Sequence, residues 1–167
     1  MSIRKRSLVK ASVIASAVIA TSAMVAAPSA SASSSVKGYS EDPTRFGSLA
    51  TCQNVFTGPV TAEDGSSGIK ASIDKVTFNF CQGGTTVSPN ALPWTLNLNQ
   101  AGYTIEGFDV NITTAGGRCR YNGTVNGVMQ FPGVYDLRGV LTRQSTGCGG
   151  PSQLNVSNSI EVIGTNG

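Results

Sequence analysis

The sequence predicts an all-β fold, an antiparallel β-sandwich or barrel of about seven to nine short strands with two disulfides. Three observations lead to this prediction. Apolar and polar residues alternate in several segments, as they do in strands with one buried face. Turns rich in glycine, asparagine and proline separate these segments. Four cysteines occur in a chain that begins with an apparent export signal.

The first 32 residues have the features of a secretory signal peptide. Basic residues near the start precede an alanine- and valine-rich run over residues 13–27, and small residues lead up to Ala32. We expect cleavage between Ala32 and Ser33 and a secreted, extracellular product. The alternative is an uncleaved membrane anchor, for which the run is only marginally long.

Removal of the signal changes the charge of the protein. The full chain has a formal net charge of +3, but four of its basic residues lie in the signal. The remaining eight basic and nine acidic residues give a net charge of −1. This composition argues against a nucleic-acid partner, since such proteins carry a basic patch. The rest of the sequence also contains no second apolar run that could cross a membrane.

The exported part divides into a leader and one domain. Residues 33–47 are polar and lack apolar periodicity, so we expect a flexible N-terminal leader. Residues 48–167 are of ordinary length for a single β domain.

Alternation identifies the strands of this domain. The segment Phe78–Leu98 is its centre, because it combines two alternating runs with a cysteine, a glycine pair and the only tryptophan. The apolar parity changes near Asp74-Lys75 and again near Gly107, which predicts bulges or bends. In the last segment Asn158 interrupts the apolar parity. The alternating apolar residues are Ile69, Ala71, Ile73, then Val76, Phe78, Phe80, then Leu92, Trp94, Leu96, Leu98, then Tyr103, Ile105, Phe108, Val110, Ile112, then Tyr135, Leu137, Leu141, and Leu154, Val156, Ile160, Val162.

The spacing of the cysteines suggests how they pair. Four cysteines allow three connectivities. Cys52 and Cys81 are 29 positions apart, and so are Cys119 and Cys148. A glycine-rich stretch follows the second cysteine of each pair. We therefore predict the bridges Cys52–Cys81 and Cys119–Cys148, and the equal spacing indicates either a duplicated supersecondary unit or a coincidence.

The composition excludes several kinds of catalytic site. The chain contains no histidine, so neither a histidine-based triad nor a histidine-ligated metal is available. We expect no metal, no cofactor and no enzymatic activity. Four strand carboxylates could in principle form a hydrolytic pair, but we favour the simpler explanation that they occupy the solvent-facing sides of their strands. They are Glu106, Asp109, Asp136 and Glu161.

The polar stretch 82–90 is the best candidate for an exposed contact surface. Its candidate binding residues are Thr85, Thr86, Ser88 and Asn90. Trp94 is either a binding platform or a core residue, and we favour the core because single tryptophans of β-sandwiches are often buried. The polar face of the following strand would extend the surface through Thr95, Asn97 and Asn99.

The order of the four cysteines around the motif Leu92-Pro93-Trp94-Thr95-Leu96 is similar to that of known secreted proteins. Over residues 51–163 the chain resembles small secreted β proteins of actinomycetes that have no assigned function. More distantly, it is similar to secreted activators of alkane oxidation. The resemblance implies an extracellular, disulfide-linked, all-β protein associated with the cell surface or with hydrophobic substrates.

These observations together predict a secreted, non-catalytic protein that binds or supports structure at the cell surface. Its expected partner is an envelope component, a polymer or a hydrophobic material. Two alternatives stay open. One is a carrier of an apolar small molecule, which a deep apolar cleft would favour. The other is a secreted hydrolase or a proteinase inhibitor.

Overall fold

The computed structural model describes residues 34–63, 68–99 and 101–165. The predicted signal peptide and its cleavage site lie outside these ranges. Every regular element within them is a β-strand, which confirms the predicted all-β class. No helix in the described part of the chain is long and apolar enough to cross a membrane.

The domain contains ten antiparallel strands, several of them longer than expected. They are β1 (Ser35–Phe46), β2 (Ala50–Glu63), β3 (Ile69–Ile73), β4 (Lys75–Asn79), β5 (Thr86–Pro89), β6 (Trp94–Asn99), β7 (Gly102–Thr114), β8 (Gly117–Phe131), β9 (Val134–Arg143) and β10 (Gln153–Thr165).

The ten strands form one sheet that closes on itself. Both β3 and β4 pair with β2, one after the other along the same strand, and β5 and β6 pair with β7 in the same manner. Each of these two pairs acts as one bent strand. The chain then runs up and down between neighbours, and β1 closes the circle by pairing with both β10 and β2. Of the two predicted architectures, the structure is therefore a barrel.

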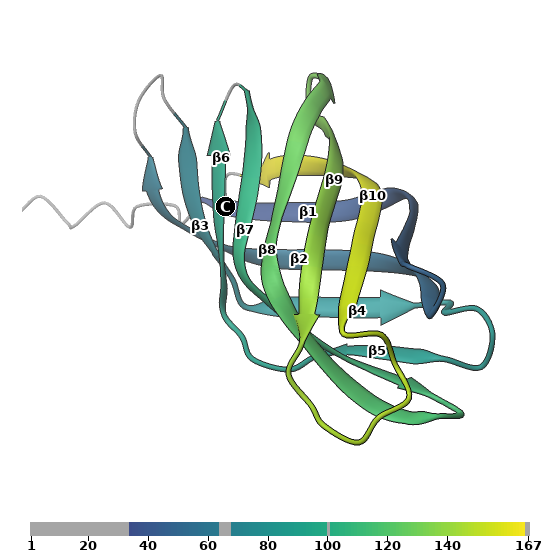
Figure 1. Ribbon diagram of the computed structural model, residues 1–167. Helices are drawn as coiled ribbons and strands as arrows, with labels where there is room; N and C mark the ends of the chain where they lie inside the picture. The colour runs from purple at the N-terminus through teal and green to yellow at the C-terminus, as the bar shows by residue number, and fades with distance from the viewer. Residues whose placement is uncertain (1–33, 64–67, 100, 166–167) are drawn as a thin grey trace, which may run out of the picture. The chain divides into compact units, whose positions relative to one another are not determined.

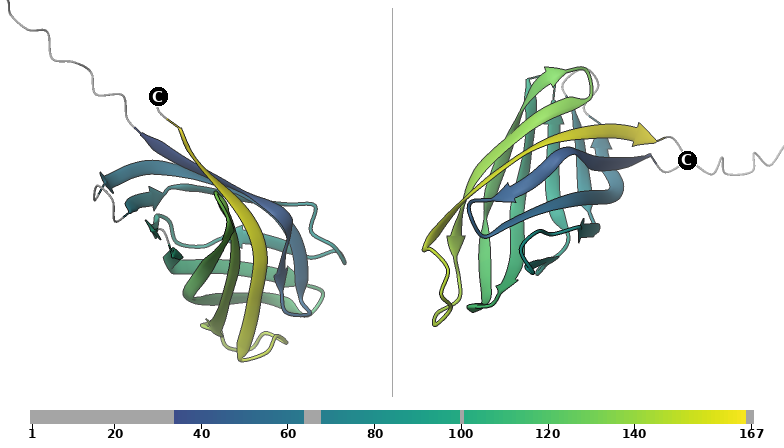
Figure 2. Two further views of the ribbon diagram at one scale, coloured as in Figure 1. Left: turned by 90° about the horizontal axis from the view of Figure 1, so that it is seen from above. Right: turned by 90° about the vertical axis from the view of Figure 1, so that its right-hand side faces the viewer.

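The barrel is flattened into two layers that cross each other. In Figure 1, β3, β6, β7, β8 and β9 run side by side, and β1, β2 and β4 cross behind them. Strand β10 belongs to both layers, because it pairs with β9 over Gln153–Glu161 and with β1 over Val156–Thr165. Figure 2 shows this strand passing from one layer to the other.

The predicted bends are present. At Asp74 the inward-facing parity changes from Ile73 to Val76, and the Asp74 amide donates a hydrogen bond to the Thr57 carbonyl at 3.1 Å. In β7 the pairing with β8 shifts register between Ile105 and Phe108. Gly107 lies at this shift with φ +72°, a conformation that L side chains rarely adopt.

The segment expected to be a flexible leader is strand β1, so that prediction is wrong. Val36, Gly38, Thr44 and Phe46 face the interior and are buried. Only two of these four are large apolar residues, which is why the alternation was inconspicuous. Gly38 is required by a close approach, since a Cβ at this position would lie 2.1 Å from the Phe56 ring.

Aromatic rings fill the interior of the barrel. The Trp94 and Phe108 ring centroids are 4.4 Å apart, and Phe46 lies 6.5 Å from Phe108 and 5.5 Å from Phe78. Such offset and edge contacts add to the stabilisation that comes from burying the rings. The cavity among them has a volume of only about 10 Å³. Side chains therefore fill the interior.

Both predicted disulfides are confirmed. Cys52 lies at the start of β2 and Cys81 just beyond β4, so the first bridge joins the two ends of a long hairpin. Cys119 lies near the start of β8 and Cys148 beyond β9, so the second bridge does the same. The equal spacing in the sequence thus corresponds to two hairpins of one kind.

Candidate functional site

The predicted polar contact stretch is only partly a loop. Thr86–Pro89 forms β5, which pairs with the end of β7, and Val87 within it is buried. Thr86 is exposed and Ser88 is half-buried. The Thr85 hydroxyl donates to the Gln82 carbonyl at 2.6 Å. The exposed turn is therefore limited to the few residues that precede β5.

Asn90 belongs to a polar cluster on the outside of the barrel. Its amide nitrogen donates to Asp109 Oδ2 at 3.2 Å, and its carbonyl oxygen accepts from the Asn111 amide at 2.8 Å. Arg120 binds the same carboxylate with distances of 2.6 to 3.1 Å. This hydrogen-bonded pairing raises the pKa of Arg120. Asp109 is 4% exposed, and through these bonds its carboxylate joins β7 to Arg120 on β8 and to Asn90.

The other three candidate carboxylates lie on the outer face. Glu106 accepts a hydrogen bond from Asn97 at 3.3 Å. Glu161 accepts one from the Tyr39 hydroxyl, and this bond raises the pKa of Tyr39. Asp136 pairs in register with Ser159, a neighbour of Glu161 on β10. Within the described residues no group of three or more potential metal-binding side chains occurs.

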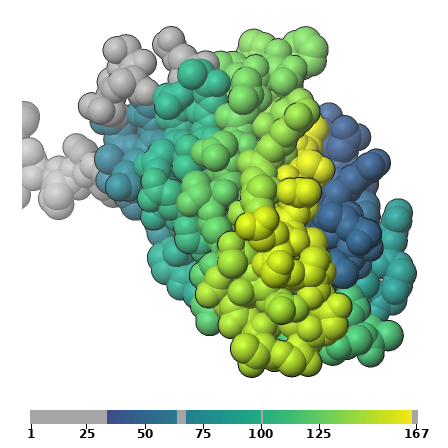
Figure 3. Space-filling model, in the orientation of Figure 1, coloured from purple at the N-terminus to yellow at the C-terminus, as the bar shows by residue number. Residues whose placement is uncertain are grey.

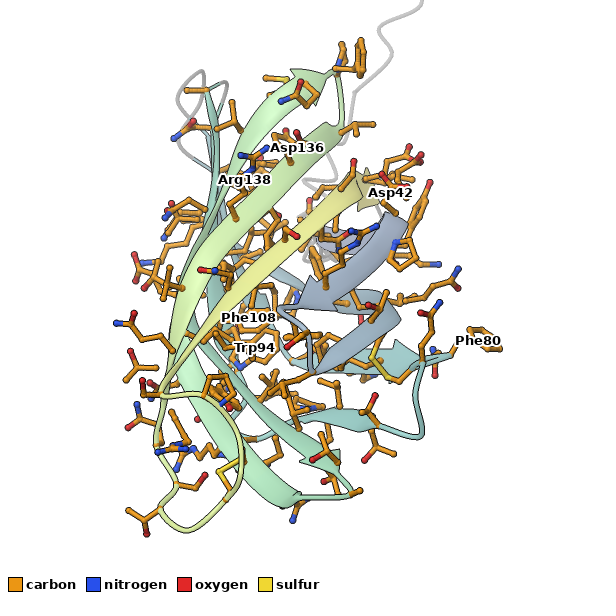
Figure 4. All side chains as sticks on the ribbon, turned by 45° about the vertical axis from the view of Figure 1, so that its right-hand side comes forward. Asp42, Phe80, Trp94, Phe108, Asp136 and Arg138 are labelled. Carbon is orange, nitrogen blue, oxygen red and sulfur yellow. A yellow bond between two sulfur atoms is a disulfide. The ribbon has the colours of Figure 1, made fainter. Side chains whose placement is uncertain are left out.

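Trp94 is a core residue. It is 2% exposed and packs against Phe108 inside the barrel, as Figure 4 shows. The preferred interpretation of this tryptophan is therefore confirmed, and the ring is not accessible as a surface platform. Thr95 and Asn97 on the same strand are half-buried and Asn99 is exposed.

A polar cleft of about 290 Å³ lies over β1, β9 and β10. Its charged lining residues come in equal numbers of each sign, Asp42 and Asp136 with Arg45 and Arg138. Figure 4 labels three of them, and in Figure 3 the β10 residues separate those of β9 from those of β1 on this face. Leu137 and Asn158 line both this cleft and the interior cavity. With no excess of charge, the cleft favours neither anions nor cations.

The interior offers no room for an apolar ligand in this structure. Binding sites for small molecules usually enclose roughly 300–1,000 Å³, whereas the interior cavity has about 10 Å³. The deep apolar cleft that would favour a carrier is not seen among the described residues.

Phe80 is the most exposed large apolar side chain in the described part of the chain, with 83% of its surface accessible. It projects away from the body of the domain in Figure 4. Its φ angle is +52°, a left-handed conformation that is uncommon for a bulky residue. Phe131, at the end of β8 beside the turn to β9, is also exposed, at 70%.

Sequence reasoning placed Phe80 on the buried face of a strand together with Phe78, and the structure corrects this. Strand β4 ends at Asn79, and the turn to Cys81 directs the Phe80 ring outward. The signal that could have revealed this was the sequence that follows, Cys81-Gln82-Gly83-Gly84. Both of these glycines have positive φ, as a tight turn requires.

Comparisons with known proteins place the chain in a family. A search of curated proteins and a search of solved structures each gave no match. A family model described as "alkane oxidation protein activator PraA/PraB-like" matches residues 1–163. The match spans nearly the whole chain, including both disulfides and all of β1. The chain therefore belongs to the PraA/PraB-like family of alkane oxidation protein activators.

Proposed function

We propose that the protein is a secreted, non-catalytic binding protein that contacts a hydrophobic material such as liquid hydrocarbon. The family's description supports a role connected with alkanes. The observation that carries the proposal is the exposed ring of Phe80 on a turn held by a disulfide.

The Phe80 ring is exposed at a cost in backbone energy. For L-amino acids the left-handed conformation costs roughly 1–2 kcal/mol. The conformation is held from both sides: Asn79 pairs with Gln53, and Cys81 is bonded to Cys52. The Gln82 amide also donates to the Thr51 carbonyl at 3.0 Å. Strain kept by its surroundings is found most often at functional sites, which supports a contact role for this ring.

Binding through one ring has a predictable magnitude. Burying a phenylalanine side chain contributes about 1.5–3 kcal/mol. This is roughly a 10- to 150-fold effect on affinity. A flexible ring would lose part of this gain on ordering, whereas the ring on the braced turn loses less.

The test measures partition of the secreted protein between buffer and hexadecane droplets, followed by retention on an octyl-substituted resin. We expect Phe80→Ser to lower both at least tenfold. Phe131→Ser is the matched control, since it removes an equally large exposed ring from a hairpin tip that has no disulfide beside it, and we expect less than a threefold change. Equal losses for the two variants would indicate nonspecific adsorption and contradict the proposal.

The non-catalytic part of the proposal needs its own test. Asp136 and Glu161 lie on adjacent strands of the outer face and are the carboxylates best placed to work together. The secreted protein should not turn over glycan, ester or peptide substrates. Turnover that disappears in Asp136→Asn or Glu161→Gln would establish a hydrolase instead. These variants are preferable to changes at Asp109, which would break the ion pair with Arg120.

A further inference from the structure

Three buried polar side chains lie inside the barrel among aromatic and aliphatic residues. They are Thr44 on β1, Asn54 on β2 and Asn158 on β10, with exposed fractions of 3%, 9% and 9%. All three line the interior cavity, together with Trp94 from β6. A buried polar group is costly unless it is hydrogen-bonded, so each polar atom here requires a partner.

The three side chains satisfy most of one another's hydrogen bonds. The Thr44 hydroxyl donates to Asn54 Oδ1 at 2.6 Å. The Asn158 amide nitrogen donates to Thr44 Oγ1 at 2.6 Å and to Asn54 Oδ1 at 2.9 Å. Because Asn54 Oδ1 can only accept, the atom of Asn158 that faces it must be the nitrogen. The orientation of the Asn158 amide is thereby fixed.

Two atoms are left over, and their chemistry is complementary. Asn158 Oδ1 is a buried acceptor and Trp94 Nε1 is a buried donor, and neither has a hydrogen-bond partner among the described residues. Leaving such a group unsatisfied costs about 1–3 kcal/mol. One hydroxyl group can accept from the indole N–H and donate to the amide oxygen.

The size of the cavity decides which hydroxyl compound fits. Its volume is about 10 Å³. A buried water needs at least about 10–15 Å³ by this kind of measure, together with two to four polar partners. The remaining wall is apolar, including Phe56, Ile105 and Phe108. There is space for one water molecule and none for an alkyl chain.

We propose that one water molecule binds in this cavity, accepting a hydrogen bond from Trp94 Nε1–H and donating one to Asn158 Oδ1. The water links β6 to the polar side chains of β1, β2 and β10. It therefore connects the two layers of the barrel through its interior. This site is independent of the hydrophobic contact proposed for Phe80.

The single tryptophan of the chain makes the test direct, because the secreted protein has one indole N–H resonance. In ¹⁵N-labelled protein we expect a rotating-frame cross-peak of dipolar sign between that proton and a long-lived water. A crystal structure at high resolution should show one water within hydrogen-bonding distance of both atoms. A slowly exchanging indole proton with no water cross-peak would overturn the proposal.

Variants distinguish an indole N–H that is bonded to a water from one that has no hydrogen-bond partner. Trp94→Phe removes the donor, and we expect a lower urea midpoint because the water loses a partner. Folded Asn158→Leu protein should lack the water cross-peak, and a cross-peak that persists in it would overturn the proposal. Tyr103→Phe is the matched control, since its buried hydroxyl also has no described partner but does not line this cavity. Its midpoint should stay the same or rise. A rise for Trp94→Phe would overturn the proposal, as would displacement of the water by added 1-hexanol.

Discussion

The two disulfide-closed hairpins have the same spacing in the sequence but different roles at their bridged ends. Beside the first bridge, Cys52–Cys81, the turn directs the Phe80 ring into solvent. Beside the second, Cys119–Cys148, residues 144–152 fold back over the fully buried Tyr121. Tyr121 donates to the Pro151 carbonyl at 3.1 Å, and the Arg143 side chain donates to the carbonyls of Cys148 and Gly150.

The difference shows that two disulfides of equal spacing can have different roles. In the first hairpin it holds a turn whose side chains make few contacts with the barrel. In the second hairpin it holds a loop that covers core residues. We therefore expect changes beside the first bridge to affect binding with little effect on stability. Changes beside the second bridge should affect stability.

The largest expected effect is at Tyr121. Truncation of a buried aromatic residue costs about 3–5 kcal/mol through lost burial and cavity formation. Tyr121→Ala should therefore lower the free energy of unfolding by about that amount, as measured by urea titration. Phe80→Ala should change it by less than about 0.5 kcal/mol, since exposed positions contribute little. A large loss for Phe80→Ala would remove the distinction between the two bridged ends.

Removal of each bridge tests the same distinction. On the chain-entropy model, loops of this length give each disulfide about 3.5 kcal/mol. The Cys119→Ala/Cys148→Ala pair should lose more than the Cys52→Ala/Cys81→Ala pair, because the covering loop is also released. Hydrogen exchange should show loss of protection around Tyr121 only in the former. Equal stability losses with no local difference in exchange would contradict the covering role.

Alkaline pH should act on β7, which carries Tyr103, and on the second hairpin, which carries Tyr121 and Tyr135. Burial raises the pKa of Tyr103, Tyr121 and Tyr135, and the first hairpin contains no tyrosine. The folded state then holds these protons more tightly than the unfolded state. Their contribution is complete below about pH 10 and is lost as pH rises towards the folded-state pKa values. For Tyr103 the loss should be about 1.4 kcal/mol per pH unit above pH 10.

Urea titrations between pH 8 and 11.5 measure this loss. In Tyr103→Phe the slope above pH 10 should be smaller, and stability at pH 7 should stay the same or rise. An unchanged slope would contradict the prediction, because it would mean that burial does not raise the pKa of Tyr103 in the folded state.

Glycines beside the two bridges should also differ in how much their substitution lowers stability. A Cβ at Gly150 would lie 2.2 Å from the Tyr121 hydroxyl oxygen and 2.9 Å from Cys119 Sγ. Gly150→Ala should therefore cost about 1–3 kcal/mol through overpacking. A Cβ at Gly84 meets nothing within 4 Å, and only its φ of +66° opposes substitution. Gly84→Ala should cost about 1 kcal/mol, as measured by thermal unfolding. A larger loss for Gly84→Ala would contradict the comparison.

The smallest expected effect on the free energy of unfolding is at Phe80, where a substitution should increase stability. Asparagine tolerates the left-handed conformation better than phenylalanine. Phe80→Asn should therefore raise the free energy of unfolding by about 0.5 kcal/mol. The same variant should lose hexadecane binding. A variant that gains stability and loses binding would show that the strain is kept for function. Loss of both would indicate that the ring supports the fold.

The sequence by itself determined the strand class, both bridges and the two bends. Alternation reports burial directly, so the runs around Ile73, Phe108 and Leu141 were recognisable. The bridges followed from spacing because each closes a hairpin of nearby strands. The interruption at Asn158 was also visible in the sequence, but not its partners, because Thr44 and Asn54 are more than 100 positions away.

Only the tertiary structure decided how the barrel closes and what its surface presents. Strand β1 has few apolar residues, and its pairing with β10 joins the first and last of the described strands, so no local pattern could reveal it. Sequence alone favoured a solvent-facing position for Asp109, whereas the structure buries it beside Arg120. Phe80 was read as buried because its parity matched Phe78. Parity applies only while a strand continues, and where β4 ends was set by the turn and the bridge to Cys52.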